Sequence, residues 1–237
     1  MSSATFVIVT AYNEAERIGA TLAALALAFP GASVWVADDG STDATPQIAR
    51  AAGARVVRSE RVIGKGAAAT LAVREALEQQ EATRGGIGAG GGHDETVFVL
   101  CDGDLGESAR VLDELARTVR SGEADIAVAL FARRVGGGLG LAIGFARWAI
   151  RRRCGLRARA PISGQRALRV GVLGDVLPFA HGFGMEVGMT IDAVRAGHRV
   201  AEVELDLSHR ATDRTPAGFA HRARQLVDFL RVYLARP

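Results

Sequence analysis

Blocks of hydrophobic residues alternate with mixed polar blocks along the first half of the chain. Short apolar runs rich in β-branched residues predict buried strands over 6–10, 34–37, 55–57, 96–101 and 125–131. Alanine- and leucine-rich blocks with helical spacing follow over 13–28, 44–52, 67–80 and 108–120. Strands that alternate with helices predict a single α/β domain whose mostly parallel, doubly wound sheet is flanked by helices.

The second half of the chain is less regular. A helix is predicted up to Ala196, a strand near 200–207 and a terminal helix from about Gly218. Two glycine-rich segments interrupt the pattern, and we interpret 84–93 as a surface insertion without assigned function. The other, 133–140, is the kind of loop that closes over a ligand.

Composition narrows the class of protein. The chain has 237 residues, of which 49% are hydrophobic, so one sizeable core is expected. The formal net charge is only +3, and aromatic residues make up 5%, which disfavours nucleic-acid binding. The two cysteines, Cys101 and Cys154, lie far apart without metal-ligand spacing, which favours a reducing cytoplasm over a disulfide framework.

The pattern predicts neither a signal peptide nor a membrane-spanning helix. The first five residues run directly into the first strand. The longest apolar stretch, 139–150, is interrupted by Arg147 and fits a core or interfacial helix. We therefore expect a cytoplasmic protein, with peripheral contact at the inner face of the membrane through 139–153 as the alternative.

A pair of carboxylates ends the apolar strand over 96–101. Asp102 and Asp104 are two residues apart, so their side chains point the same way if the strand continues. Mg²⁺ and Mn²⁺ bind through one or two carboxylates together with substrate phosphates. The pair therefore predicts a divalent-cation site for a nucleoside diphosphate, and a solvated turn is the alternative interpretation.

Other polar residues follow the predicted strands in the same manner. Asn13-Glu14, Asp38-Asp39 and His209 each come at the carboxyl end of a strand, which is where open α/β sheets bind ligands. Lys65 is the one lysine among 29 basic residues, which makes it a candidate functional residue, although a surface position would also explain it. The turn over 11–14 lacks the glycines that a dinucleotide-dependent oxidoreductase or a nucleotidyltransferase needs.

These motifs together resemble the family 2 glycosyltransferases of the GT-A fold. The resemblance rests on Val9-Thr10-Ala11-Tyr12-Asn13-Glu14, Ala37-Asp38-Asp39-Gly40-Ser41-Thr42-Asp43 and Asp102-Gly103-Asp104, in the order and spacing of that family. It implies a hexosyltransferase that takes its sugar from a nucleoside diphosphate. It also implies a nucleotide-binding half over 1–104 and an acceptor-binding half over 105–237.

The resemblance assigns roles to residues of the donor site. It implies that the nucleoside is contacted by Ala11, Tyr12, Glu14 and Asp39, with Lys65 against the base, as in similar glucosyl-3-phosphoglycerate synthases. It implies that Asp104 binds the metal and acts in catalysis, that Asp102 contacts ribose or metal, and that Gly103 belongs to the same donor motif. The resemblance also implies a histidine from the late strand at the metal, which makes His209 a further candidate ligand, although a lone histidine is usually structural. Imidazole accompanies carboxylates at Mn²⁺, and Arg210 and Arg214 would face the diphosphate. UDP-glucose is the donor that the Lys65 segment implies.

The acceptor side is less determined. Glu186 opens a predicted helix, where a carboxylate can simply complement the helix dipole, but the resemblance makes it a general base or an anchor for the acceptor. Ser163, Gly164, Gln165 and Arg166 resemble a Ser-Gly-x-Arg segment near sugar and acceptor.

Two acceptors compete, a small phosphorylated acid such as 3-phosphoglycerate and a polyprenyl phosphate at the membrane surface. The second would use 139–148 as an interfacial helix and Arg147, Arg151, Arg152 and Arg153 against anionic lipid. The stereochemical outcome and the oligomeric state stay open, and so does a non-catalytic sugar-nucleotide sensor.

Overall fold

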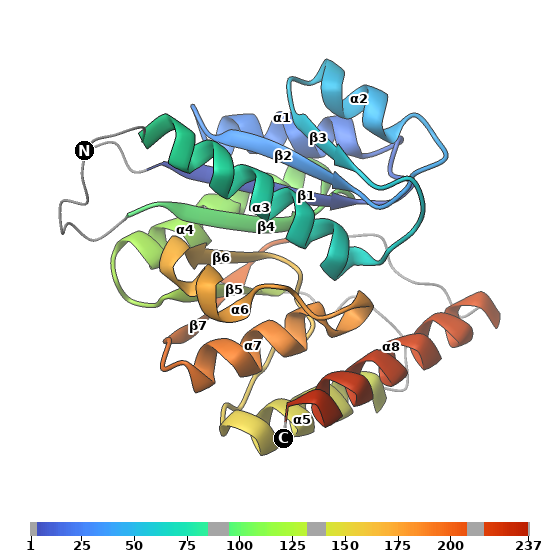
Figure 1. Cartoon of the computed structure of the whole chain (residues 1–237), viewed down its shortest axis with the longest axis vertical. Coiled ribbons are helices and arrows are strands. Elements are labelled where there is room, and N and C mark those ends of the chain that lie inside the picture. The colour runs from blue at the N-terminus through green and yellow to red at the C-terminus, as the bar shows by residue number, and fades with distance from the viewer. Residues whose placement is uncertain (1–3, 85–94, 132–140, 208–215, 237) are drawn as a thin grey trace.

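The computed structural model describes residues 4–84, 95–131, 141–207 and 216–236 and has the expected α/β architecture (Figure 1). The described residues form one sheet of seven strands in the order β3-β2-β1-β4-β6-β5-β7. All neighbours pair in parallel except β6, which is antiparallel to β4 and β5. The strands are β1 (Thr5–Ala11), β2 (Ser33–Asp38), β3 (Arg55–Arg58), β4 (Val97–Asp102), β5 (Ile126–Phe131), β6 (Arg166–Arg169) and β7 (Val200–Leu205).

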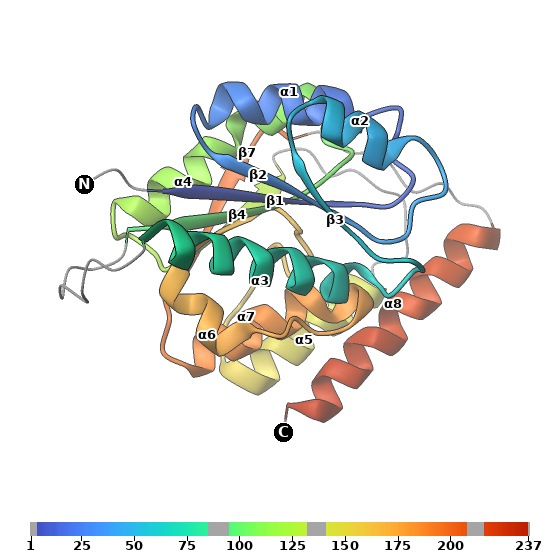
Figure 2. The ribbon, with the colours of Figure 1, turned by 45° about the horizontal axis from the view of Figure 1, so that its top comes forward.

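Helices cover both faces of the sheet (Figure 2). One apolar cluster joins the sheet to α1 (Ile18–Ala28), α2 (Thr45–Ala51), the 3₁₀ helix η1 (Gly106–Leu112) and α4 (Asp113–Arg120). A second cluster joins the other face to α3 (Lys65–Arg84), the 3₁₀ helix η2 (Val170–Val172), α6 (Leu173–Val176) and α7 (Met185–Arg195). The doubly wound arrangement is therefore confirmed.

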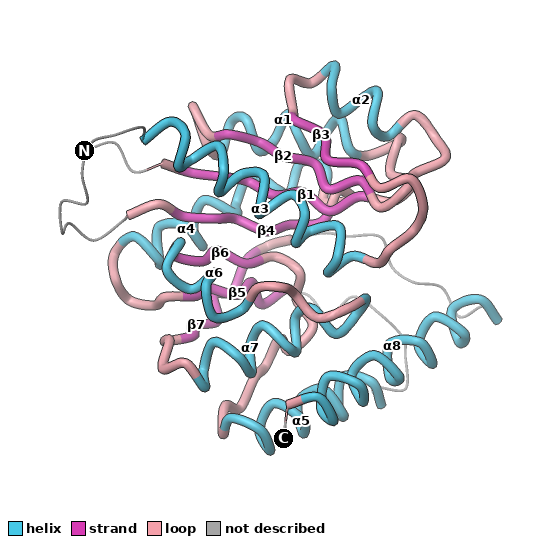
Figure 3. Tube along the Cα trace, viewed as in Figure 1, coloured by secondary structure: helices cyan, strands magenta, loops and turns pink. Residues whose placement is uncertain are grey.

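A third layer lies outside α7. Buried residues of α5 (Leu141–Cys154), α7 and α8 (Pro216–Ala235) form a separate apolar cluster. The short 3₁₀ helix η3 (Gly182–Gly184) comes directly before α7. In the view of Figures 1 and 3, α5 and α8 lie at the opposite end of the molecule from β3. Among the described residues, no helix is both long and apolar enough to cross a membrane.

Several element boundaries differ from the sequence-based expectation. The helix expected from residue 13 begins at Ile18, because Asn13 has a φ of 55° that a helix cannot contain. The helix expected over 108–120 begins as η1 and becomes α-helical only at Asp113. Strand β6 was not predicted, because its sequence, Arg-Ala-Leu-Arg, has a charged residue at each end. The two glycine-rich segments, 85–94 and 132–140, lie outside the described residues.

Candidate active site

The carboxyl ends of β1, β2 and β4 lie next to one another, and a cavity of about 450 Å³ opens there. Such a volume suits a small-molecule ligand. Parallel strands end at one edge of the sheet, which brings the polar residues that follow them together. The cavity is lined by Thr10, Ala11, Tyr12, Glu14, Ala37, Asp39, Lys65, Ala68, Asp102, Gly103, Asp104, Ile162, Phe183, Glu186, Gln225 and Phe229.

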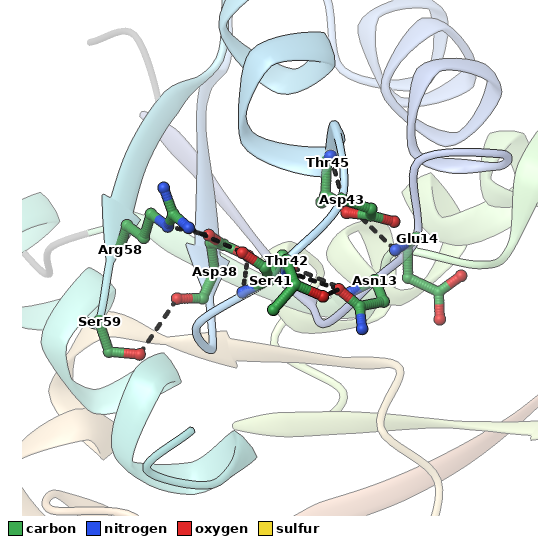
Figure 4. A network of polar contacts seen from close by, with 9 residues as sticks. All are labelled: Asn13, Glu14, Asp38, Ser41, Thr42, Asp43, Thr45, Arg58 and Ser59. Atoms are coloured by element: carbon green, nitrogen blue, oxygen red, sulfur yellow. Dashed lines mark hydrogen bonds and ion pairs between the residues drawn. The ribbon is translucent and has the colours of Figure 1, made fainter. Parts of the chain in front are cut away.

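The turns after β1 and β2 are joined by a polar network (Figure 4). The backbone N–H of Asn13 donates to Ser41 Oγ at 2.9 Å, and Asn13 Oδ1 accepts from the backbone N–H of Thr42 at 2.8 Å. Asp38, which is fully buried, accepts from the N–H of Ser41 at 3.2 Å and pairs with Arg58 Nε at 3.1 Å. The network thereby holds the two turns that carry Glu14 and Asp39 into the cavity wall.

Replacing Asn13 with alanine should lower the free energy of unfolding by about 1–2 kcal/mol, because alanine loses the bond to Thr42 and tolerates a positive φ poorly. Asn13→Gly keeps the backbone conformation accessible and loses only the side-chain bond, so its cost should be roughly half as large. Urea unfolding of the two variants measures the difference. Equal losses would show that the φ of Asn13 carries no strain.

Asp39 joins the second turn to the loop that precedes α3. Its Oδ1 accepts from the N–H of Ile63 at 2.7 Å, and both carboxylate oxygens lie 3.0 Å from the N–H of Gly64. Because three such contacts orient the carboxylate, Asp39 faces the cavity in one fixed position. The loop it holds leads directly into Lys65, the first residue of α3.

Lys65 lies between two carboxylates that come from distant parts of the chain. Its Nζ is 2.7 Å from Asp102 Oδ1 and 2.7 Å from Glu186 Oε1. Burial lowers the pKa of Lys65, but the two negative charges outweigh burial and raise the pKa above its ordinary value. The lysine is therefore a permanent cation that links β4 to the start of α7.

Asp102 is held by further donors. Thr10 Oγ1 donates to its Oδ1 at 3.1 Å and Gln165 Nε2 donates to its Oδ2 at 2.7 Å. Burial raises the pKa of this carboxyl group, while the charge of Lys65 lowers it and prevails, so the pKa lies below its ordinary value. Asp102 is thus an ionised, tightly oriented carboxylate at neutral pH.

Asp104 and Gly103 complete the acidic motif. The N–H of Gly103 donates to the Thr10 carbonyl at 2.9 Å, and an added Cβ there would lie 3.0 Å from Ile18 Cδ1, so the close turn favours glycine. Asp102 and Asp104 both line the cavity, so the two carboxylates of the motif border the same space. Two hard carboxylates fit Mg²⁺ or Mn²⁺ when a diphosphate supplies further oxygens.

The described residues contain no cluster of three or more histidine, cysteine or acidic side chains that would hold a metal alone. Three residues expected from the sequence at this site, His209, Arg210 and Arg214, lie outside the described residues. Their roles stay predictions.

The segment 163–166 lies against the acidic motif but does not line the cavity. Gln165 orients Asp102, and Ser163 Oγ donates to Gln165 Oε1 at 3.3 Å. A Cβ added to Gly164 would lie 2.5 Å from Lys65 Nζ and 2.8 Å from Asp102 Oδ2, so the ion pair packs directly on this glycine. These residues therefore support the donor side in this structure, and contact with an acceptor stays a prediction.

Arg166 is deeply buried for a charged residue. It is 1% exposed, and it donates from Nε to the Ser163 carbonyl at 2.8 Å and from Nη1 to Thr190 Oγ1 at 2.9 Å. Burial lowers its pKa to about 10, although Glu186 and Glu202 counteract the burial. Arg166 thus lies inside the protein and joins the turn at Ser163 to α7, and its expected contact with an acceptor stays a prediction.

Glu186 faces the cavity from the first turn of α7 and is 4% exposed. Its ion pair with Lys65 shows that it does more than complement the helix dipole. Sequence reasoning missed the apolar wall beside it, Ile162, Phe183 and Phe229. No motif marks these three, because η3 and α8 reach the site only through tertiary packing.

The fold and this cavity define a class of protein, namely α/β proteins that bind a ligand at the acidic carboxyl edge of a parallel sheet. The particular family follows from comparison. The model of glycosyl transferase family 2 matches residues 6–141, more than half of the chain, so the chain belongs to this family and is a glycosyltransferase. No curated protein gave a significant match.

Solved structures of glucosyl-3-phosphoglycerate synthase from Mycobacterium tuberculosis are similar over the whole chain. The complex with phosphoglyceric acid is 25% identical with a TM-score of 0.72, covering 100% of this chain and 81% of that chain. The complex with Mn²⁺, UDP-glucose and glycerol 3-phosphate is 26% identical with a TM-score of 0.72, covering 100% and 82%. The complex with Mg²⁺ and UDP is 27% identical with a TM-score of 0.72, covering 100% and 81%.

Proposed function

We propose that this protein is a metal-dependent glucosyltransferase that moves glucose from UDP-glucose to an oxygen of a small phosphorylated acid such as 3-phosphoglycerate. The observation that carries the proposal is the cavity at the carboxyl edge of the sheet, which Asp39, Asp102 and Asp104 line together with Lys65, itself paired with Asp102 and Glu186. The ligands bound by the similar synthase, UDP-glucose with Mn²⁺ and phosphoglyceric acid, support it.

Residues of this chain would divide the work between donor and acceptor. Ala11, Tyr12, Glu14 and Asp39 would hold the nucleoside, while Asp104, Asp102 and His209 would hold the cation, and Arg210 and Arg214 would face the diphosphate. When bound, the cation would neutralise charge on the departing diphosphate. Glu186 would accept a hydrogen bond from the acceptor hydroxyl and orient it toward the sugar.

A thermal-shift screen tests the donor. UDP, GDP, CDP, dTDP and their sugars are each added with and without Mn²⁺ or Mg²⁺, because a ligand that binds only the folded state raises the melting temperature. We expect the largest metal-dependent shift with UDP and UDP-glucose. A larger shift with GDP compounds would overturn the choice of donor, and no shift with any nucleotide would overturn the proposed function.

Asp104→Ala should abolish the metal-dependent part of UDP binding and leave the fold intact, because it removes a cavity-lining carboxylate that would be a ligand of the cation. Calorimetry with UDP, in the presence and absence of Mn²⁺, measures the effect, which we expect to be about 100-fold or more in affinity. Asp113→Ala is the control, because Asp113 is a partly exposed carboxylate of α4 that pairs with Arg117 and does not line the cavity. Unchanged UDP affinity in Asp104→Ala with Mn²⁺ would contradict the metal assignment.

A polyprenyl phosphate is the second candidate acceptor, favoured by apolar side chains that α5 exposes, such as Leu141 at 71% and Trp148 at 49%. Assays with UDP-glucose and either 3-phosphoglycerate or a short polyprenyl phosphate distinguish the two. Release of UDP with either acceptor, or slowly with water, also separates an enzyme from a sugar-nucleotide sensor.

A further inference from the structure

Large apolar side chains that are exposed to solvent gather on α5 and α8. Of the 11 such residues in the described part of the chain, 7 belong to these two helices. We define the α5–α8 face by these residues, which are Leu141, Ile143, Trp148, Leu226, Val227, Leu230 and Leu234. Scattered exposed leucines are ordinary in proteins, but a concentration on two adjacent helices indicates an interaction surface.

The α5–α8 face is built on a rigid support. Leu226, Leu230 and Leu234 are four residues apart and form one stripe along α8, while Phe229 and Val232 on the opposite side are buried. Trp148 of α5 lies beside this stripe, because its ring centroid is 4.8 Å from that of Tyr233. Figures 1 and 2 show α8 along the outside of the molecule, and the three leucines of the stripe are exposed to solvent.

Positive charge surrounds the apolar stripe. Helix α5 contains no acidic residue and exposes Arg147, Arg151 and Arg152, while α8 exposes Arg231. The one acidic residue in α8, Asp228, is mostly buried, and it accepts from the N–H of Phe183 and pairs with Arg231. A second copy of the chain, docked symmetrically, would present the same two helices, whose one acidic residue is already paired, so the arginines would gain no charge partner there.

We propose that the α5–α8 face binds the surface of an anionic lipid bilayer. Apolar side chains with a tryptophan on one side and arginines around them are the features by which amphipathic helices lie in the head-group region. Leu230, Leu234 and Trp148 enter the interfacial layer, and Arg151 and Arg152 contact the anionic head groups. The same helix, α8, lines the cavity with Phe229, so binding brings the candidate active site close to the bilayer.

Vesicle flotation tests the proposal with the full chain and three variants. Vesicles of phosphatidylcholine alone are compared with vesicles of equal parts phosphatidylcholine and phosphatidylglycerol. We expect binding to the anionic vesicles, reduced about tenfold or more in Leu230→Asp/Leu234→Asp by the lost apolar contact and in Arg151→Glu/Arg152→Glu by the reversed charge. Leu27→Asp is the matched control, because Leu27 is 63% exposed on α1, on the other face of the sheet, and should bind like the original protein.

Failure to bind anionic vesicles, or equal binding by all variants, would overturn the proposal. Light scattering in solution measures the oligomeric state, and so tests whether a second copy of the chain occupies the face instead. A dimer that becomes a monomer in Leu230→Asp/Leu234→Asp would show that a second copy covers the face. UDP binding without vesicles is measured in parallel. It tests the cavity and not the exposed side chains of the α5–α8 face, so the proposed transferase function and this membrane contact can fail separately.

Discussion

Gly164→Ala is expected to slow the release of UDP from UDP-glucose about 100-fold, because small displacements of an active-site group have effects of this size. The added methyl group would lie 2.5 Å from Lys65 Nζ and 2.8 Å from Asp102 Oδ2, which is too close for either atom to stay in place. Since Asp102 is held between Lys65 and Gln165, both contacts must be rebuilt. The loss should fall on turnover and metal-dependent donor binding, and the free energy of unfolding should drop by only about 1–3 kcal/mol.

Steady-state kinetics and urea unfolding separate the two effects. Gly174→Ala is the matched control, since it adds the same methyl group in α6 with no neighbouring atom within 4 Å. It should leave turnover unchanged. Normal turnover in Gly164→Ala would show that the Lys65–Asp102 pair can shift without consequence for the reaction.

Lys65→Met should lower the free energy of unfolding by about 2–3 kcal/mol, since it leaves two carboxylates facing each other without their cation. We expect less than the about 3–5 kcal/mol typical of fully buried pairs, because the side chain of Lys65 is 26% exposed. Donor binding should fall as well, because Asp102 loses the contact that orients its Oδ1. Thermal and urea unfolding measure the first effect and calorimetry with UDP the second.

The stability that Lys65→Met loses should depend on pH. In the original protein the pKa of Asp102 lies below its ordinary value, so its stabilising contribution is complete at neutral pH and is lost as the pH falls through the folded-state pKa. In Lys65→Met, Asp102 loses the charge that lowers its pKa, so the variant's deficit should be full at neutral pH and shrink below about pH 4, where the carboxyl group of Asp102 takes up a proton. The double variant Lys65→Met/Glu186→Gln removes one charge and should recover part of the stability. A deficit that is constant with pH would mean that lost packing, and not charge, explains it.

Local sequence patterns predicted most of the nucleotide-binding half of the fold. β1, β2 and β4 are short apolar runs without polar alternation, because a parallel sheet is buried on both faces. Strand ends are visible in a sequence because a polar residue follows an apolar run directly. For this reason Glu14, Asp39, Asp102 and Asp104 could be expected at one edge, and the structure brings them to one cavity.

Strand β6 shows why the rest could not be predicted. Its four residues pair with β4 on one side and β5 on the other, partners that lie tens of residues away in the chain. Arg166 in this strand is buried because Ser163 and Thr190 offer it acceptors, and no local pattern announces such partners. The sequence motif therefore placed Arg166 near an acceptor but gave no sign that its side chain is buried.

What the sequence determined by itself is the order of strands and helices in the first half and the types of side chain at the strand ends, since both depend on neighbours in the chain. What only the tertiary structure decided is how these groups meet. Lys65 could be singled out as a rare residue, but its place between Asp102 and Glu186 required α3, β4 and α7 to pack together. The apolar wall of Phe183 and Phe229 and the exposed leucines of α8 likewise depend on where α8 packs on the rest of the protein. Such contacts form between segments far apart in the chain, and their free energy comes from burial and charge pairing that no short stretch of sequence contains.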